Sequence, residues 1–247
     1  DETGRVTSVA GTPDAPGTFY MGASGGGLWK TEDQGLTWRN VSDDWFGSPS
    51  IGDIGIALND ANIVYVGTGS DGIRSNVIRG DCVYKSIDGG ATWKHLGLDR
   101  TGHIGAVEID PTNHNVVWVA AIGQAFEANP ERGLYRTRDG GRSWQQVLFV
   151  SDTVGIADVE LLPGNPDVIY AAAWKVLRRP WTIVSGGAAD EGGIFKSVDG
   201  GETWEKLERG LPDGLIGKID LATSPADSRL LYALVEAPGD AGGLYVS

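Results

Sequence analysis

A nine-residue phrase recurs four times in this chain and constrains its fold more than any other feature. Its core is Ser/Thr-x-Asp-x-Gly-x-Ser/Thr-Trp, in which the Asp can bond backbone N–H groups two residues on and the Gly permits the positive φ of a tight turn. The Trp is the largest apolar side chain available for packing against the next unit. We therefore predict a repeat protein. The phrase reads KTEDQGLTW at residues 30–38, KSIDGGATW at 85–93, RTRDGGRSW at 136–144 and KSVDGGETW at 196–204.

The spacing of the phrase predicts the size of the repeat. Its aspartates are Asp33, Asp88, Asp139 and Asp199, so successive copies lie 55, 51 and 60 residues apart. A period of about 50 residues with strand-like content is typical of a propeller blade, whereas helical solenoids mostly have shorter repeats. We therefore predict an all-β fold, a β-propeller whose blades each contain four antiparallel strands.

Each repeat carries the same four strand signals, and no helix of any length is legible. A small and apolar first run is followed by a turn rich in Pro, Asp and Asn, and then by a β-branched and aromatic second run. A third run leads into the phrase, and the fourth strand is expected to carry the Trp. The first three runs lie at residues 5–9, 19–21 and 28–30, then 54–58, 63–66 and 83–85, then 106–109, 116–119 and 134–136, then 157–161, 168–171 and 194–196, and finally 218–222, 230–233 and 244–246.

The repeats are predicted to form a single propeller segment over residues 1–247, with an incomplete last blade. Residues 243–247 read as the third strand of a fifth blade, and too few residues precede the first strand to supply the missing fourth strand. We expect about 4.75 blades of a larger ring of roughly seven or more. A closed five-bladed ring is the alternative, but it leaves an unpaired edge, which proteins avoid. The predicted blades span about residues 5–45, 51–98, 103–150, 155–210 and 216–247.

Charge and composition argue against several classes of partner and site. The formal net charge of −13 disfavours a surface for nucleic acid or for an anionic membrane. No apolar run approaches ~20 residues, so no membrane span is expected. Cys82 is the single cysteine and the three histidines are scattered, so no metal site is predicted. The Gly-Gly pairs lie in turns between strands and form no phosphate-cradling motif, so no cofactor is expected.

The phrase resembles the Asp-box, or bacterial neuraminidase repeat. Families that share it include sialidases, xyloglucan-active glycoside hydrolases, the ten-bladed sortilin luminal domain and a propeller-shaped photosystem assembly factor. Further phrases at residues 80–86, 103–105 and 178–182 are most similar to bacterial secreted proteins described as sortilin-like or "glycosyl hydrolase, repeat-containing". This resemblance implies a secreted, periplasmic or cell-envelope location in a bacterium.

The resemblance also implies a role for the four aspartates. In Asp-box propellers these turns join strands three and four on the outer rim, away from the axis where ligands bind, so a structural role is expected rather than a metal array. The residues assigned to it are Asp33, Gly35, Trp38, Asp88, Gly90, Trp93, Asp139, Gly141, Trp144, Asp199, Gly201 and Trp204.

Candidate binding residues lie where the repeats differ. In a propeller, the loops between strands two and three share one face with the loops between blades, and this face is the default ligand site. The former loops are long at residues 67–81, 120–132 and 172–192. The alternative is that these loops pack on one another with their charges solvated or paired, and that His103 is a structural histidine. The predicted ligand-binding residues are Asp53, Arg74, Arg79, Asp81, His103, Glu127, Trp174, Arg178, Arg179 and Trp181.

The hydrolase families set requirements that can be compared with this sequence. Glycosidases need two carboxyl groups roughly 5 to 10 Å apart, and Asp44 or Asp53 with Asp81 are candidates, although no sequence spacing singles out a pair. The resemblance places a catalytic Asp of xyloglucan-active relatives at about Ser24. Sialidases begin with a Phe-Arg-Ile-Pro stretch, where this chain has Gly4-Arg5-Val6-Thr7. No catalytic residue is assigned on this basis.

The leading expectation for function is a non-catalytic binding or scaffolding propeller that holds a peptide, a protein partner or a glycan. One alternative is a glycoside hydrolase, xyloglucanase-like or sialidase-like, whose site is completed by regions outside this sequence. The other is a structural subunit of a larger complex. The rest of its own chain or another subunit is a further candidate partner, completing the ring.

Overall fold

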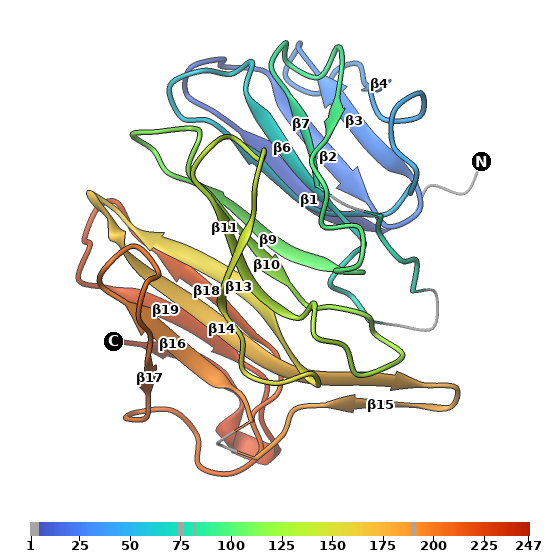
Figure 1. Cartoon of the computed structure of the whole chain (residues 1–247). Coiled ribbons are helices and arrows are strands. Elements are labelled where there is room, and N and C mark those ends of the chain that lie inside the picture. The colour runs from blue at the N-terminus through green and yellow to red at the C-terminus, as the bar shows by residue number, and fades with distance from the viewer. Residues whose placement is uncertain (1–4, 74–76, 82, 189–190) are drawn as a thin grey trace. The chain divides into compact units, whose positions relative to one another are not determined.

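The computed structural model describes residues 5–73, 77–81, 83–188 and 191–247. Over these residues the chain consists of β-strands joined by turns, with one short 3₁₀ helix, η1 (Gly239–Ala241), and no α-helix (Figure 1). No helix in this part of the chain is long and apolar enough to cross a membrane.

The strands form antiparallel sheets in which neighbours in sequence are neighbours in the sheet. This order confirms the predicted all-β fold of four-stranded antiparallel sheets. In the fourth repeat an additional strand, β15, pairs with β14, and the sheet of the fifth repeat has three strands within the described residues. The strands are β1 (Val6–Gly11), β2 (Phe19–Ala23), β3 (Gly27–Thr31) and β4 (Arg39–Asn40); β5 (Ile51–Ile56), β6 (Val64–Thr68), β7 (Val83–Ser86) and β8 (Lys94–His95); β9 (Ile104–Ile109), β10 (Val117–Ala121), β11 (Gly133–Thr137) and β12 (Gln145–Leu148); β13 (Val154–Leu162), β14 (Asn165–Arg179), β15 (Thr182–Ser185), β16 (Gly193–Ser197) and β17 (Glu205–Leu207); and β18 (Ile219–Thr223), β19 (Leu231–Val235) and β20 (Gly243–Val246).

The first strands β5, β9 and β13 begin earlier than the sequence predicts, because an Ile-Gly or Val-Gly pair there belongs to the strand. The predicted run begins at Ile54, whereas β5 begins at Ile51 and includes Gly52. A Cβ atom on Gly52 would lie 2.1 Å from the carbonyl oxygen of Ile104 in the neighbouring first strand. Glycine is therefore required by a close backbone approach.

The chain comprises two compact units, residues 1–119 with 136–145, and residues 120–135 with 146–247. Each has an apolar core between its sheets. The prediction that residues 1–247 form one propeller segment with the blade limits given above stays a prediction. The first core contains Tyr20, Leu28, Val41, Ile51, Ile54, Val64, Val66, Tyr84 and Trp93, with Phe46 packed against it. The second contains Ala172, Ile194, Ile216, Ile219, Leu221, Leu231, Ala233 and Val235, with Tyr170, Leu207, Leu211 and Tyr245 packed against it.

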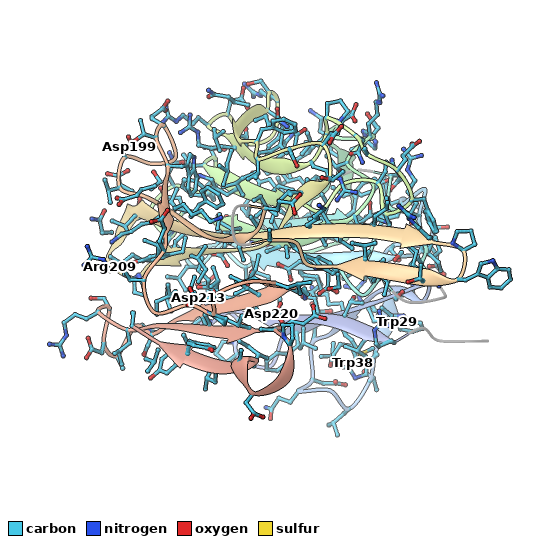
Figure 2. All side chains as sticks on the ribbon, turned by 90° about the horizontal axis from the view of Figure 1, so that it is seen from below. Trp29, Trp38, Asp199, Arg209, Asp213 and Asp220 are labelled. Atoms are coloured by element: carbon cyan, nitrogen blue, oxygen red, sulfur yellow. The ribbon has the colours of Figure 1, made fainter. Side chains whose placement is uncertain are left out.

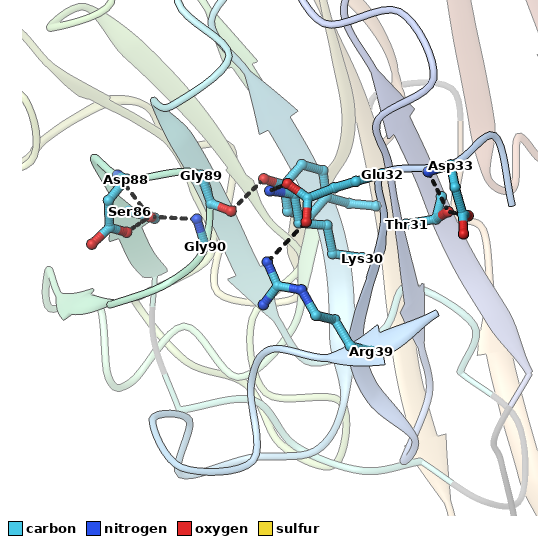
Figure 3. A network of polar contacts seen from close by, with 10 residues as sticks. Lys30, Thr31, Glu32, Asp33, Arg39, Ser86, Asp88, Gly89 and Gly90 are labelled. Atoms are coloured by element: carbon cyan, nitrogen blue, oxygen red, sulfur yellow. Dashed lines mark hydrogen bonds and ion pairs between the residues drawn. The ribbon is translucent and has the colours of Figure 1, made fainter. Parts of the chain in front are cut away.

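The recurring phrase forms the same turn between the third and fourth strands of four repeats, which we call the Asp turns (residues 31–38, 86–93, 137–144 and 197–204). In the second Asp turn, Asp88 Oδ1 accepts hydrogen bonds from Ser86 Oγ at 2.8 Å and from the Thr92 N–H at 2.9 Å. Its Oδ2 accepts the Thr92 hydroxyl at 2.6 Å, and Ser86 Oγ accepts the Gly90 N–H at 2.8 Å. Figure 3 shows part of this network beside the first turn. The same carboxylate bonds recur at Asp33, Asp139 and Asp199.

The tryptophans of the second and third Asp turns pack on the preceding repeat. Trp93 donates its indole N–H to the Val41 carbonyl at 2.9 Å, and Trp144 donates to the Leu96 carbonyl at 2.9 Å. The prediction that they pack against the next unit is therefore wrong in direction. Each Trp also lies just before the fourth strand rather than within it, because that strand begins only where the turn ends.

The tryptophans of the first and fourth Asp turns make a different contact. Trp38 donates to the Gly35 carbonyl and Trp204 to the Gly201 carbonyl, both at 3.2 Å and within their own turns. Trp38 is 36% exposed, whereas Trp93 is 7% exposed. The tryptophan of the phrase is thus buried against the preceding repeat in one Asp turn and packs, partly exposed, on its own turn in another.

The predicted long loop over residues 172–192 is wrong for its first half. Strand β14 continues to Arg179 and pairs first with β13 and then with β15 in a hairpin that extends away from its sheet (Figure 1). The run Trp174-Lys175-Val176-Leu177 has strand propensity, and β15 supplies the backbone partners that keep it extended.

Candidate functional site

A hollow of about 510 Å³ lies beside the segment that joins β6 to β7 in the first unit. It brings together two residues that the sequence predicts, Arg79 and Asp81, with two that it does not, His95 and Asp99. His95 belongs to β8, which follows the second Asp turn, so a search confined to the loops between second and third strands misses it. The complete lining is Gly47, Ser48, Pro49, Ile78, Arg79, Gly80, Asp81, His95 and Asp99.

Asp81 is held in one orientation by two hydroxyl groups. Its Oδ1 accepts the Thr68 hydroxyl at 3.0 Å, and its Oδ2 accepts the Tyr84 hydroxyl at 2.8 Å. The Tyr84 oxygen in turn accepts the Gly47 N–H at 2.9 Å. A Cβ atom on Gly47 would lie 2.3 Å from Asp81 Oδ2, so a larger residue at this position would displace the Asp81 carboxylate. The carboxylate is therefore preorganised at the edge of the hollow.

The other charged groups of the hollow are more exposed. Arg79 donates from Nη2 to the Asp99 carbonyl at 3.2 Å, and Ser48 donates its hydroxyl to the Arg79 carbonyl at 2.8 Å. The His95 Nε2 atom lies 2.8 Å from Asp99 Oδ1. Two carboxylates, a guanidinium and an imidazole thus border one open hollow, which suits a ligand rich in hydroxyl groups.

A second polar cluster is buried in the first unit around Ser70. Its hydroxyl donates to Ser24 Oγ at 3.2 Å, its N–H donates to Ser50 Oγ at 3.2 Å, and its carbonyl lies 3.0 Å from His103 Nδ1. Ser24 and His103 are both less than 4% exposed. The structure therefore places His103 and the position expected for a catalytic Asp in the interior, where each has a polar partner.

Asp53 and Asp158 occupy equivalent positions on first strands, each at an irregularity in the pairing with the second strand. Asp53 accepts the Ser8 hydroxyl at 2.6 Å and the Val107 N–H at 2.9 Å. Asp158 accepts the Leu221 N–H at 2.6 Å. Burial raises the pKa of both carboxyl groups, to about 8 for Asp158, and nearby Asp71 adds to the rise at Asp53. Each carboxyl group thus links its strand to the first strand of the following repeat.

The hairpin formed by β14 and β15 carries four predicted binding residues, Trp174, Arg178, Arg179 and Trp181, of which Arg179 is exposed and pairs with Thr182. Arg178 donates from Nη1 to the carbonyls of Arg179 and Thr182, at 2.8 and 2.9 Å. Trp181 is 97% exposed at the hairpin turn. Trp174 is buried and donates its indole N–H to Ser185 Oγ at 3.1 Å. Arg178 therefore braces the hairpin, while Trp181 is the accessible aromatic group.

Two predicted binding residues remain, Glu127 and Arg74. Glu127 is exposed, and its carbonyl accepts from Arg132 Nη2 at 3.2 Å. Arg132 is fully buried, and among the described residues its Nε and Nη1 atoms have no hydrogen-bond partner. Burial lowers the pKa of Arg132 to about 10. Arg74 lies outside the described residues, so its predicted role stays a prediction, as do those of the other site residues.

Curated relatives of this chain are xyloglucanases. It is 24% identical over 238 residues to the xyloglucanase Xgh74A of Acetivibrio thermocellus, covering 84% of this chain and 26% of that protein. It is 25% identical over 214 residues to a xyloglucanase of a Paenibacillus species, covering 76% and 19%. The chain thus spans about a quarter or less of the length of these relatives. No family model matches it.

Solved structures show the same fold. The GH74 enzyme of Niastella koreensis matches with a TM-score of 0.68 and 20% identity over 99% of this chain and 35% of that one. The GH74 xyloglucanase of Xanthomonas campestris matches with a TM-score of 0.57 and 16% identity over 99% and 44%. At this identity the likeness concerns the fold, and it confirms the predicted β-propeller class.

These relatives correct the leading functional expectation. A non-catalytic binding or scaffolding propeller is wrong as the main interpretation, because the curated relatives are named as xyloglucanases, which are glycoside hydrolases. The repeat phrase does not identify a function, since it reports the fold and occurs in proteins of several functions. The alternative given above, a glycoside hydrolase, is the one that the relatives support. This chain is a β-propeller protein whose sequence is similar to xyloglucanases.

Proposed function

We propose that this chain is part of a glycoside hydrolase that acts on a xyloglucan-type polysaccharide, and that the hollow beside Asp81 holds the glycan. The observation that carries the proposal is the sequence similarity to xyloglucanases over 76–84% of the chain. Because the chain covers only about a quarter of those proteins, the activity of the whole protein is part of the proposal.

The hollow has the chemistry that a polysaccharide site needs. Sugar hydroxyls are bound by carboxylates and by Arg side chains, and Asp81, Asp99 and Arg79 supply both within one lining. Hydrolysis requires two carboxyl groups facing one cleft. Asp81 and Asp99 are the carboxylates that line the hollow, so we assign them as the first pair to test. Ser24 carries no carboxyl group and is buried, so the acid is not assigned to that position.

Affinity electrophoresis and a reducing-sugar assay on the same polysaccharide test this proposal. We expect xyloglucan in the gel to retard the chain and the chain to release reducing ends from it. Asp81→Asn and Asp99→Asn should abolish the release, while Asp44→Asn, at an exposed aspartate away from the hollow lining, should not. A folded chain that is neither retarded by xyloglucan nor able to cleave it would refute the proposal.

Location and finer family belong to the same proposal. Plant-type polysaccharides lie outside cells, so a secreted or envelope location follows from the substrate. The resemblance of the repeat to the Asp-box of sortilin-like proteins is also part of this proposal. The four Asp turns support it. A protein or peptide partner is compatible with this proposal.

A further inference from the structure

The dipeptide Asp-Gly occurs five times in this chain and can react with itself. The glycine nitrogen can attack the carboxyl carbon of the Asp side chain, because no Cβ atom on the glycine hinders the approach. An N–C bond forms, the nitrogen loses its proton and the carboxyl group loses a hydroxyl, so one water leaves and a succinimide ring remains. Water then opens the ring at either carbonyl and gives Asp or isoaspartate. The dipeptides begin at Asp71, Asp88, Asp139, Asp199 and Asp213.

Three of these dipeptides lie in Asp turns, where the attacking nitrogen already makes a hydrogen bond. In the second Asp turn, Gly89 donates its N–H to the Asn62 carbonyl at 3.0 Å. Attack requires this nitrogen to give up its proton and to turn toward the carboxyl carbon, so the bond must break first. The equivalent N–H to carbonyl bonds of the third and fourth Asp turns, both 2.9 Å long, join Gly140 to Asn115 and Gly200 to Asp167.

The carboxyl groups of the Asp turns are also protected, because the ring closes through the neutral form of the carboxyl group. Hydrogen bonds from the hydroxyls of Thr92 and Thr203 hold the pKa of Asp88 and Asp199 down to about 2. The pKa of Asp139 is lowered by hydrogen bonds of the same kind. The Asp turn therefore keeps its carboxylate ionised and fixes the position of both oxygens.

The dipeptide Asp71-Gly72 is enclosed on one side. Both residues are half-buried, and Arg5 donates from Nη2 to the Gly72 carbonyl at 3.4 Å. A Cβ atom on Gly72 would lie 2.1 Å from Arg5 Nη2, so the guanidinium group lies directly against this glycine. The contact restricts movement of the Gly72 backbone.

Within the described residues, Asp213-Gly214 has neither form of protection. Both residues are exposed in the segment that joins β17 to β18, and no described residue forms a hydrogen bond with the Asp213 carboxyl group or the Gly214 N–H. A Cβ atom on Gly214 would meet no heavy atom within 4 Å. Exposure is a property of such joining segments, since the segment after β8, between two four-stranded sheets, leaves Asp99 exposed as well. Figure 2 shows Asp213 and the protected Asp199 on different loops of the second unit.

We propose that Asp213 is a site of spontaneous isoaspartate formation, and that the Asp turns protect the same dipeptide from this reaction elsewhere in the chain. Isoaspartate routes the backbone through the side-chain methylene, so the chain before Gly214 becomes one carbon atom longer and the α-carboxylate becomes a side group. The change falls in the lining of a hollow of about 420 Å³, to which Lys206 and Glu208 also contribute. The modified residue carries the carboxylate that enzymes of the isoaspartyl methyltransferase class methylate.

Incubation of the intact chain at pH 6, followed by digestion and electron-transfer fragmentation, tests the site. This fragmentation cleaves the Cα–Cβ bond of isoaspartate and so distinguishes it from Asp. We expect isoaspartate to accumulate at residue 213 at least tenfold faster than at residues 88, 139 and 199. An isoaspartyl methyltransferase with a labelled methyl donor should label the incubated chain, and Asp213→Glu should remove most of the label, because its longer side chain closes a six-membered ring less readily. Equal rates at the four positions, or faster reaction in an Asp turn, would overturn the proposal.

Two further measurements separate protection by the fold from the effect of the neighbouring sequence. In concentrated urea, which unfolds the chain, the rates at the four positions should become similar. A difference that persists in urea would show that the sequence and not the fold selects Asp213, and would overturn the proposal. The double variant Ser86→Ala with Thr92→Val removes two hydroxyl donors from Asp88, so isoaspartate at residue 88 should increase while the rate at residue 139 stays unchanged. An unchanged rate at residue 88 in a variant that thermal unfolding shows to be folded would contradict protection by the Asp turn.

Discussion

The Asp turns and the first strands place the same residue type in opposite environments. Asp88 in the second Asp turn lies in solvent, and hydrogen bonds from Thr92 and Ser86 hold its pKa down to about 2. Asp158 on β13 is enclosed, and burial raises its pKa to about 8 although two backbone N–H groups bond to it. Hydrogen bonds therefore determine the direction of the pKa shift at Asp88, and desolvation determines it at Asp158.

The comparison separates the structural from the reactive uses of carboxyl groups. A shifted pKa in a cleft is often taken to mark an active site, yet structural networks shift pKa values as well. Asp158 has an equivalent in Asp53, which makes the same kind of bond to the following repeat. Because the contact repeats with the fold, we interpret both groups as links between strands, and we look for chemistry at Asp81 instead.

Replacing the buried carboxyl group should have the largest effect. Asp158→Ala leaves the N–H groups of Leu221 and Val159 without this acceptor, and each unsatisfied buried group costs about 1–3 kcal/mol. We expect the free energy of unfolding to fall by about 3 kcal/mol in urea titrations at pH 6. Asp158→Asn keeps an acceptor oxygen and should cost less than about 1 kcal/mol. If asparagine were as damaging as alanine, the negative charge would be essential and the interpretation of Asp158 would be wrong.

Replacing an Asp-turn carboxylate should have a smaller effect. Asp88→Ala removes the bonds to the Thr92 N–H, the Thr92 hydroxyl and Ser86 Oγ. Solvent can replace part of this network, so we expect a loss of about 2 kcal/mol, measured as a lower urea midpoint with unchanged slope. Asp44→Ala, at an exposed surface aspartate, is the matched control. Retardation by xyloglucan should be unaffected, and its loss without a change in stability would place the Asp turn at the binding site.

The contrast between local and long-range contacts explains how much of the fold could be predicted. The Asp turn is local: Ser86, Asp88, Gly90 and Thr92 lie within seven residues, so the sequence alone shows the bonding pattern. The strands of each repeat could be predicted from the apolar runs that precede and follow the turn, with small errors at the strand ends. The direction in which Trp93 packs could not be predicted, because its Val41 acceptor lies 52 residues away. The hairpin after Trp174 could not be predicted, because polar residues such as Lys175 and Arg178 are typical of a loop when the partner strand, β15, is unknown.

The candidate site was only partly predictable for a related reason. Arg79 and Asp81 stand in a loop that differs between repeats, and this difference predicts them as ligand-binding residues. His95 and Asp99 enter the same hollow from the far side of an Asp turn, and no local pattern marks them. Asp53 resembles a ligand residue in the sequence, but its partners Ser8 and Val107 are 45 and 54 residues away. Tertiary contacts decide these roles.

The pH dependence of stability near neutrality should report Asp158. Its folded pKa is about 8 while the unfolded value is near 3.8, so between these limits the folded state retains a proton that the unfolded state releases. Stability therefore falls as the pH rises from about 4 to 8, by less than about 1.4 kcal/mol per pH unit for one group. Asp158→Asn should flatten this slope in urea titrations at pH 5, 6, 7 and 8. Parallel slopes for the two proteins would contradict the enclosed environment of Asp158.

Below pH 4, the dependence of stability on pH should have the opposite sign and the smallest magnitude of these effects. The folded pKa of Asp88 is about 2 and the unfolded value is 3.8, so below pH 4 the unfolded state binds the proton more readily. The stabilisation from Asp88 is complete above pH 4 and is lost as the pH falls toward 2. The difference in melting temperature between the parent and Asp88→Ala should therefore shrink from pH 5 to pH 2. Because the group is exposed, we expect this change to correspond to about 1 kcal/mol or less. A constant difference would mean that packing of the turn, and not the ionised carboxylate, accounts for the contribution of Asp88.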